Sequence, residues 1–142
     1  MPIKLNPYIS FKDNAREAME FYKSVFGGEL DLTTFKEGGM PATGTPSDDN
    51  IMHAELKAEN GINFMASDTP DTIPYTPGAS VSLSLSGDNE EELRDYWDKL
   101  ADGGTITMPL EKAPWGDIFG MLTDKYGIHW MVDVLAPAQN EK

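Results

Sequence analysis

His53 and Glu55 are the residues of this chain whose types and spacing best suit chemistry, in the run Met52-His53-Ala54-Glu55-Leu56. Residues two apart on a strand project from the same face, so the imidazole and the carboxylate are expected side by side. A neighbouring carboxylate sets the charge of an imidazole near neutral pH, and such a pair can act as general base and general acid. The alternative is a polar pair that only shapes a binding pocket, and this simpler interpretation takes precedence.

Other side chains suit ligand binding better than catalysis. In Trp115-Gly116-Asp117, the indole could stack on a ligand or pack against a sheet, and the carboxylate could orient a ligand or cap a turn. Met65 and Met131 could supply an adaptable apolar floor for a flat ligand, or simply pack. The alternating Ser80, Ser82, Ser84 and Ser86 have no partner base and are small enough to keep a cavity open.

The composition excludes several classes of function. The formal net charge of -13 repels phosphate backbones and anionic lipid surfaces, so neither nucleic acid nor a membrane is expected as a partner. The absence of cysteine excludes disulfides, thiolate nucleophiles and cysteine zinc sites. No apolar run has the length of a signal peptide or a membrane span, so a cytoplasmic protein is expected.

The chain contains a sequence repeat, and the repeat indicates which elements carry the candidate site residues. The offset is 75 positions from Asp13 to Asp88 and from Phe21 to Tyr96, and the Gly-Gly pairs that follow are 76 apart. Two short units that each lack a full core must pack together, so residues 1–142 are expected to form one domain with units at 1–68 and 79–135. The matching pairs are Asp13-Asn14 and Asp88-Asn89, Phe21-Tyr22 and Tyr96-Trp97, and Gly27-Gly28 and Gly103-Gly104.

Each unit is predicted to run strand, helix, strand, strand, strand. Asp13 or Asn14 can cap the first helix, with Glu17 in a capping box, and Asp88 with Glu91 can form the same kind of cap on the second helix. Residues 38–50 are predicted to form a loop and 68–78 the linker between units. The predicted strands cover 5–11, 29–35, 51–57, 62–67, 81–85, 105–110, 118–123 and 128–134.

Strand alternation sorts the side chains into two faces. The apolar set is expected to pack under the helices; it comprises Met52, Ala54, Leu56, Ile62, Phe64, Ala66, Val81, Leu83, Leu85, Ile128, Trp130 and Val132. The opposite set is polar and thioether, and it would line a shared cavity if the two sheets curve towards each other. Its members are Asn6, Tyr8, Ser10, His53, Glu55, Asn63, Met65, Ser67, Ser82, Ser84, His129, Met131 and Asp133.

Six stretches, taken with the duplicated order of elements, carry a family resemblance: Leu5–Phe11, Glu20–Gly28, Ile51–Leu56, Met65–Asp68, Trp115–Asp117 and Thr123–Gly127. In these stretches the chain resembles the vicinal oxygen chelate superfamily of glyoxalase I, extradiol dioxygenases, and bleomycin and fosfomycin resistance proteins, and most closely its PhnB-like branch. The resemblance implies an α+β fold of two tandem βαβββ units forming a curved mixed sheet around a cavity, and a homodimer.

In metal-dependent relatives, the first and last strands of each unit supply His, Gln or Glu as ligands. The matching positions here hold Asn6 or Tyr8, Met65, Ser82 and Met131, which are poor ligands for hard or borderline divalent ions. No cofactor and no family-type metal is therefore expected, although His53, Glu55 and His129 could make a non-standard site if their strands converge. The methyltransferase label common in this branch lacks support, because no Gly-rich turn follows Leu5–Phe11.

The sequence thus predicts a small-molecule binding protein without the usual metal. The alternative is a lyase or isomerase that uses His53 and Glu55 for acid–base chemistry, possibly with a non-standard divalent metal. Sequestration of a drug or toxin is a third possibility, which would require an aromatic-lined groove at a dimer interface. The predicted ligand-binding residues are Asn6, Tyr8, Met65, Ser82, Trp115, Asp117, His129 and Met131.

Overall fold

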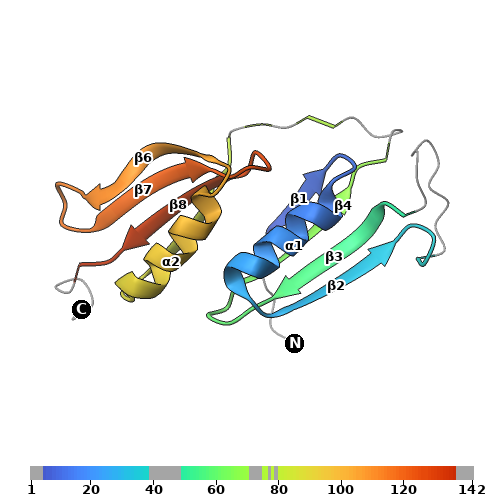
Figure 1. Cartoon of the computed structure of the whole chain (residues 1–142), viewed down its shortest axis with the longest axis horizontal. Coiled ribbons are helices and arrows are strands. Elements are labelled where there is room, and N and C mark those ends of the chain that lie inside the picture. The colour runs from blue at the N-terminus through green and yellow to red at the C-terminus, as the bar shows by residue number, and fades with distance from the viewer. Residues whose placement is uncertain (1–4, 39–48, 71–74, 77, 79, 137–142) are drawn as a thin grey trace. The chain divides into compact units, whose positions relative to one another are not determined.

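The computed structural model describes residues 5–38, 49–70, 75–76, 78 and 80–136, arranged in two compact units, Met1–Pro77 and Gly78–Lys142. Each unit runs strand, helix, strand, strand, strand, with its helix lying across its own sheet (Figure 1). The first comprises β1 (Tyr8–Phe11), α1 (Ala15–Phe26), β2 (Glu29–Thr34), β3 (Ile51–Lys57) and β4 (Asn63–Asp68). The second comprises β5 (Leu83–Gly87), α2 (Glu90–Ala101), β6 (Thr105–Lys112), β7 (Ile118–Thr123) and β8 (His129–Val134).

The two sheets have the same topology. Their strand orders are β1-β4-β3-β2 and β5-β8-β7-β6, and in each the first strand pairs in parallel with the last while the other pairs are antiparallel. This duplicated α+β arrangement confirms the predicted pair of βαβββ units. Within the described ranges, neither helix has the length and apolar character that crossing a membrane requires.

The helix-covered faces are those that alternation predicts. Phe64 on β4 and Trp130 on β8 are each 3% exposed, whereas the residues on either side of them are half-buried. In the first unit, the Phe64 ring meets the Tyr22 ring of α1 edge-on, with centroids 5.4 Å apart. Phe64 and Trp130 therefore occupy equivalent core positions in the two units, as the repeat predicts.

The two helices begin by different means. Asn89 caps α2, because its side chain accepts a hydrogen bond from the Glu92 amide at 3.0 Å; the predicted cap at Asp88 is wrong by one residue. Asn14 occupies the cap position of α1 without making a side-chain cap bond. The carboxylate of Asp68, at the end of β4, instead accepts a hydrogen bond from the Ala15 amide at 2.9 Å.

Gly28 ends the turn after α1 at a position that admits no side chain. Its φ is +89°, and a Cβ there would overlap the carbonyl oxygen of Lys57 on β3. The Gly-Gly pair therefore stops the helix and lets β2 approach β3 closely.

Met52 and Val81 depart from the predicted core set. Thr33 pairs with His53 and Thr34 with Ile51, so Met52 is an extra residue in a β-bulge and Ile51, fully buried, takes the core position. Val81 is 73% exposed and precedes β5, because that strand begins only at Leu83. Most of the predicted loop, residues 39–48, and part of the predicted linker lie outside the described residues.

Candidate functional site

The helix-free face of the first sheet carries a continuous row of functional side chains. Tyr8 pairs with Met65, Met65 with Glu55, and Glu55 with Asp31, so these four residues cross all four strands in register. Directly paired residues project to the same side of a sheet. The row therefore lies opposite α1 and places three predicted site residues together.

His53 reaches this row from β3. Its Nδ1 atom lies 3.4 Å from the Tyr8 hydroxyl, and the two rings are 5.9 Å apart at an interplanar angle of 46°. The distance is long for a hydrogen bond, so the contact is a weak one that a ligand can displace. Tyr8 is half exposed, which leaves the pair open on its outer side.

His53 and Glu55 share a face but contact different partners. The ring of His53 meets Tyr8, and the Glu55 carboxylate lies 4.0 Å from the ammonium nitrogen of Lys57. At that distance, and with the Lys57 side chain 56% exposed, the ion pair holds its members only loosely. The two residues therefore stand as separate polar groups on one surface.

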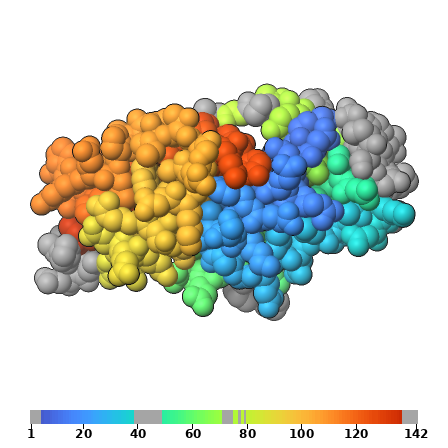
Figure 2. All heavy atoms as spheres, in the orientation of Figure 1, coloured from blue at the N-terminus to red at the C-terminus, as the bar shows by residue number. Residues whose placement is uncertain are grey.

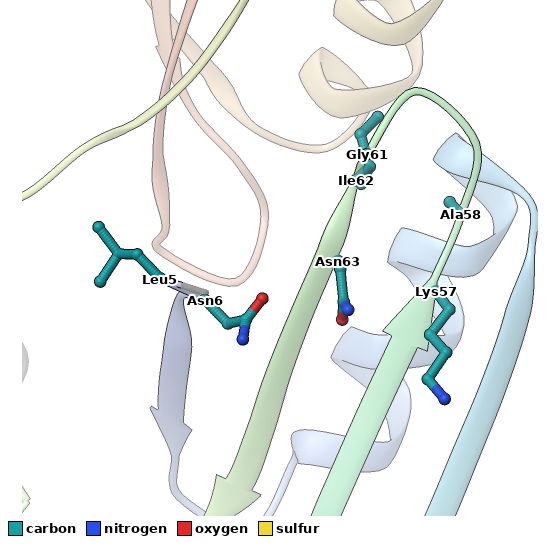
Figure 3. Close-up of a pocket in the computed structure, with 7 residues that line it drawn as sticks. All are labelled: Leu5, Asn6, Lys57, Ala58, Gly61, Ile62 and Asn63. Carbon is teal, nitrogen blue, oxygen red and sulfur yellow. The ribbon is translucent and has the colours of Figure 1, made fainter. Parts of the chain in front are cut away.

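A hollow of about 510 Å³ opens at the end of the same sheet, where β1 begins and the β3–β4 hairpin turns (Figure 3). Asn6, two residues before β1, and Asn63, at the start of β4, present carboxamides, and Lys57 adds a positive charge from β3 (Figure 3). The Asn63 Oδ1 atom is buried without a hydrogen-bond partner. The lining residues are Leu5, Asn6, Lys57, Ala58, Gly61, Ile62 and Asn63.

The turn that walls this hollow follows from its sequence. Asn60 and Gly61 both have positive φ, 64° and 71°, which asparagine and glycine tolerate best. Hydrogen bonds from the Ala58 amide to Ile62 at 2.8 Å and from the Ile62 amide to Glu59 at 3.2 Å close the turn. A tight turn thus holds Asn63 at the start of β4, beside Lys57.

The second unit holds the remaining predicted site residues. Trp115 is 59% exposed and meets Phe119 edge-on with centroids 5.8 Å apart, so the indole is not buried against the sheet. His129 contacts the Thr123 hydroxyl through Nδ1 at 2.9 Å. Ser82 is exposed and precedes β5, and Met131 lies half-buried on β8.

Asp117 is 3% exposed and has a structural hydrogen bond: it accepts from the Ala136 amide at 2.9 Å, which fixes the chain after β8. Beside it, Asp133 has one carboxylate oxygen buried without a partner. Burial, followed by the hydrogen bond with Asp117 and the negative charge of Asp117, raises the pKa of Asp133. Alternation placed Asp133 on the helix-free face, but its interaction with Asp117 joins residues 16 positions apart and could not be predicted from the local pattern.

The structure gathers Asn6, Tyr8, His53, Glu55 and Met65 on the helix-free face of the first sheet and leaves the other predicted residues in the second unit. Sequence reasoning missed Lys57 as a lining residue, since only the pairing of Lys57 with Asn63 shows that they share this surface. Within the described ranges, no group of three or more His, Cys, Asp or Glu side chains is arranged to hold a metal ion. The absence of a family-type metal stays a prediction.

Comparison with known proteins assigns the chain to a family. The family model described as 3-demethylubiquinone-9 3-methyltransferase matches residues 3–133. Protein YjdN of Escherichia coli is 30% identical, covering 92% of this chain and 95% of YjdN. Protein PA1353 of Pseudomonas aeruginosa is 36% identical with a TM-score of 0.79, over 93% of this chain and 97% of that one.

Two further structures relate the fold to named groups. A Bacillus cereus structure described as a putative 3-demethylubiquinone-9 3-methyltransferase, PhnB protein, is 31% identical with a TM-score of 0.73, over 92% of this chain and 98% of that one. A glyoxalase-related enzyme from Fulvimarina pelagi is 16% identical with a TM-score of 0.61, over 92% of this chain and 88% of that one. At that identity, the second likeness concerns the fold alone, which is glyoxalase-like.

Proposed function

The chain belongs to the PhnB-like family described as 3-demethylubiquinone-9 3-methyltransferase, and from its own site we propose that it binds a small polar organic molecule on the helix-free face of the first sheet. The observation that carries the proposal is the hollow of about 510 Å³ beside Asn6, Lys57 and Asn63. Its volume falls in the range of small-molecule sites, roughly 300–1,000 Å³.

The buried Oδ1 of Asn63 supports the proposal energetically. A buried acceptor without a partner costs about 1–3 kcal/mol, and a ligand in the hollow recovers this cost if the Asn63 carboxamide turns towards it and accepts its hydrogen bond. The Lys57 ammonium and the amide of Asn6 offer donors in return. The preferred ligand therefore carries both a donor and an acceptor, as hydroxy acids and amides do.

The methyl transfer in the family description is not part of the proposal. A methyltransferase must hold an adenosyl cofactor, usually at a glycine-rich turn between a first parallel strand and a helix. The segment between β1 and α1 is Lys12-Asp13-Asn14, which contains no glycine. The helix of this unit begins instead with its Ala15 amide bonded to Asp68.

The test is whether an organic compound co-purifies through Asn63. Denaturing the protein and identifying released compounds by mass spectrometry should yield one enriched compound from the parent chain and none from Asn63→Leu. Because that change also removes an unpartnered buried oxygen, Asn63→Leu should unfold at the same or a higher temperature. Glu20→Leu, at an exposed position of α1 outside the hollow lining, is the control and should retain the compound. Equal recovery from Asn63→Leu would contradict the proposal.

A second candidate function rests on the Tyr8–His53 contact. The phenol hydroxyl lies 3.4 Å from an imidazole nitrogen, and shortening of this contact around a bound substrate would give the proton-transfer pair that a lyase or isomerase needs. Such an enzyme exchanges a proton with a carbon of its substrate. The co-purified compound, incubated with the protein in D2O, should then gain deuterium with the parent chain and none with His53→Gln. If the compound gains no deuterium with the parent chain, acid–base catalysis is excluded and only the binding function remains.

A further inference from the structure

Three methionines lie in one row across the second sheet. Met131 on β8 pairs with Met121 on β7, and Met121 pairs with Met108 on the outer strand β6. Met121 and Met131 project to the helix-free face, because their neighbours Leu122, Trp130 and Val132 are buried on the other face. Met108 shares that face because it pairs directly with Met121. Met121 and Met131 are half-buried and Met108 is 44% exposed. Figure 2 views the second unit from its helix side, with α2 in yellow, so the helix-free face that carries the methionines is the one turned away from the viewer.

A β-bulge puts the third methionine in the row. Ile106 pairs with Leu122, so regular pairing would place Thr107 opposite Met121. The register shifts between Ile106 and Met108, and Met108 takes that position instead. Bulges commonly re-aim a side chain beside a functional site. The irregularity therefore replaces a hydroxyl by a thioether at the open end of the row.

The first unit provides an internal comparison. At the corresponding place, the row of its helix-free face runs Tyr8, Met65, Glu55 and Asp31, with one thioether followed by two carboxylates. The row of the second unit is Ser84, Met131, Met121 and Met108. The same scaffold thus presents hard oxygen ligands in one unit and soft sulfur ligands in the other.

We propose that Met108, Met121 and Met131 form a binding site for one soft monovalent metal ion, Cu(I) or Ag(I). Thioethers select such ions over hard and borderline divalent ones. Directly paired strand residues have Cβ atoms roughly 4.5–5.5 Å apart. Two sulfurs on opposite sides of an ion at about 2.3 Å each, the metal–sulfur distance of zinc sites, lie about 4.6 Å apart. Neighbouring methionines can therefore bind the ion in two-coordinate geometry, and the third completes three-coordination.

Two features favour an ion over an apolar molecule on this row. The chain contains no cysteine, so no thiolate competes for a soft ion. Its net charge of -13 attracts cations. The site is independent of the hollow in the first unit, so either proposal can fail without the other.

The test is a titration of the full chain, labelled with carbon-13 at the methionine methyl groups, with Ag(I) in chloride-free buffer under NMR observation. The methyl signals of Met108, Met121 and Met131 should shift together and saturate at one ion per chain. The signals of Met19 and Met65 should stay in place. Zn(II) at the same concentration should move none of the three.

Variants complete the experiment. Met121→Leu, which keeps the volume of the central side chain, should weaken Ag(I) binding at least tenfold, whereas Met65→Leu should leave it within twofold. The parent titration is decisive by itself if Met121→Leu fails to fold. Equal shifts at Met65, no saturation at one ion, or unchanged binding by Met121→Leu would overturn the proposal. The proposal would also be overturned if the chain bound an uncharged naphthalene probe at the three methionines and did not bind Ag(I).

Discussion

Buried aspartates fix the backbone of this acidic chain at three places. Asp68, Asp117 and Asp124 are each at most 3% exposed, and each accepts hydrogen bonds from the backbone. Hydrogen bonds of this kind compensate a carboxylate for the loss of water. The donors are the Ala15 and Ile51 amides for Asp68, the Ala136 amide for Asp117, and the Tyr126 and Ile128 amides with the Trp130 indole for Asp124.

Asp133 differs from these three, and its raised pKa predicts a pH dependence. The folded chain holds the Asp133 proton to higher pH than the unfolded chain, so the contribution of this group to stability is greatest at low pH and declines as pH rises through the folded pKa. Asp133→Asn should therefore match the parent in unfolding free energy near pH 4 and exceed it at pH 8. Chemical denaturation across this range measures the difference, with Asp98→Asn, an exposed change on α2, as control. If Asp133→Asn raises the unfolding free energy by the same amount at pH 4 and pH 8, ionisation of Asp133 is not the cause of the stabilisation.

His53 and Glu55 are expected to serve ligand handling rather than folding. Both are half-buried on the helix-free face, whereas Leu56 beside them is fully buried. Leu56→Ala should lower the unfolding free energy by about 2–5 kcal/mol. His53→Ala and Glu55→Ala should each cost less than about 1 kcal/mol, the scale of surface changes. Thermal unfolding of the three variants is the measurement, and equal losses would make the polar pair structural.

At the scale of elements, the helix caps supply a matched pair. Asn89 makes a cap bond to Glu92, while Asn14 occupies the same position on α1 without one. Asn89→Ala should therefore cost about 1 kcal/mol of unfolding free energy, and Asn14→Ala less than about 0.5 kcal/mol. Urea denaturation compares the two. Equal costs would mean that the cap bond at Asn89 contributes nothing of its own.

The types of the elements and the buried faces of the strands could be predicted from the sequence, because strand alternation and helical spacing involve residues close together in the chain. Phe64 and Trp130 show this, since both lie where alternation placed them. The bulges at Met52 and before Met108 were not predictable, because an extra residue depends on the partner strand. The helix-free face of the first sheet could be predicted in part: Tyr8, His53 and Glu55 were found, but the role of Lys57 depends on its pairing with Asn63. The methionine row could not be predicted from the sequence, because it depends on the register of three strands.

At the scale of the whole molecule, the main feature is the excess of negative charge. The chain has 24 acidic and 11 basic residues, so its net self-repulsion opposes the folded state. Some of this charge is well placed: Glu90, Glu91 and Glu92 lie in the first turn of α2, where the helix dipole favours negative charge. Most of the excess is left to solvent and to counterions.

Salt should therefore stabilise the fold. Raising NaCl from about 10 mM to 150 mM shortens the screening length from roughly 30 Å to 8 Å, which weakens repulsion between separated carboxylates. We expect the unfolding temperature to rise over this range. Differential scanning calorimetry at constant pH measures it, and sucrose at matched osmolality is the control for exclusion effects. A lower unfolding temperature in salt would show that attractive surface pairs outweigh the repulsion.

The pairing of the first strand of each unit with its last has a consequence for synthesis on the ribosome. The hairpins of the second, third and fourth strands can form as soon as each emerges, but β1 has no partner until β4 has been made. Asp68, the last residue of β4, is also the acceptor for the start of α1 and for the start of β3. The first unit therefore cannot complete its sheet until β4 has been synthesised, and a nascent chain halted before Asp68 leaves β1 without its partner strand and the Ala15 amide without this acceptor.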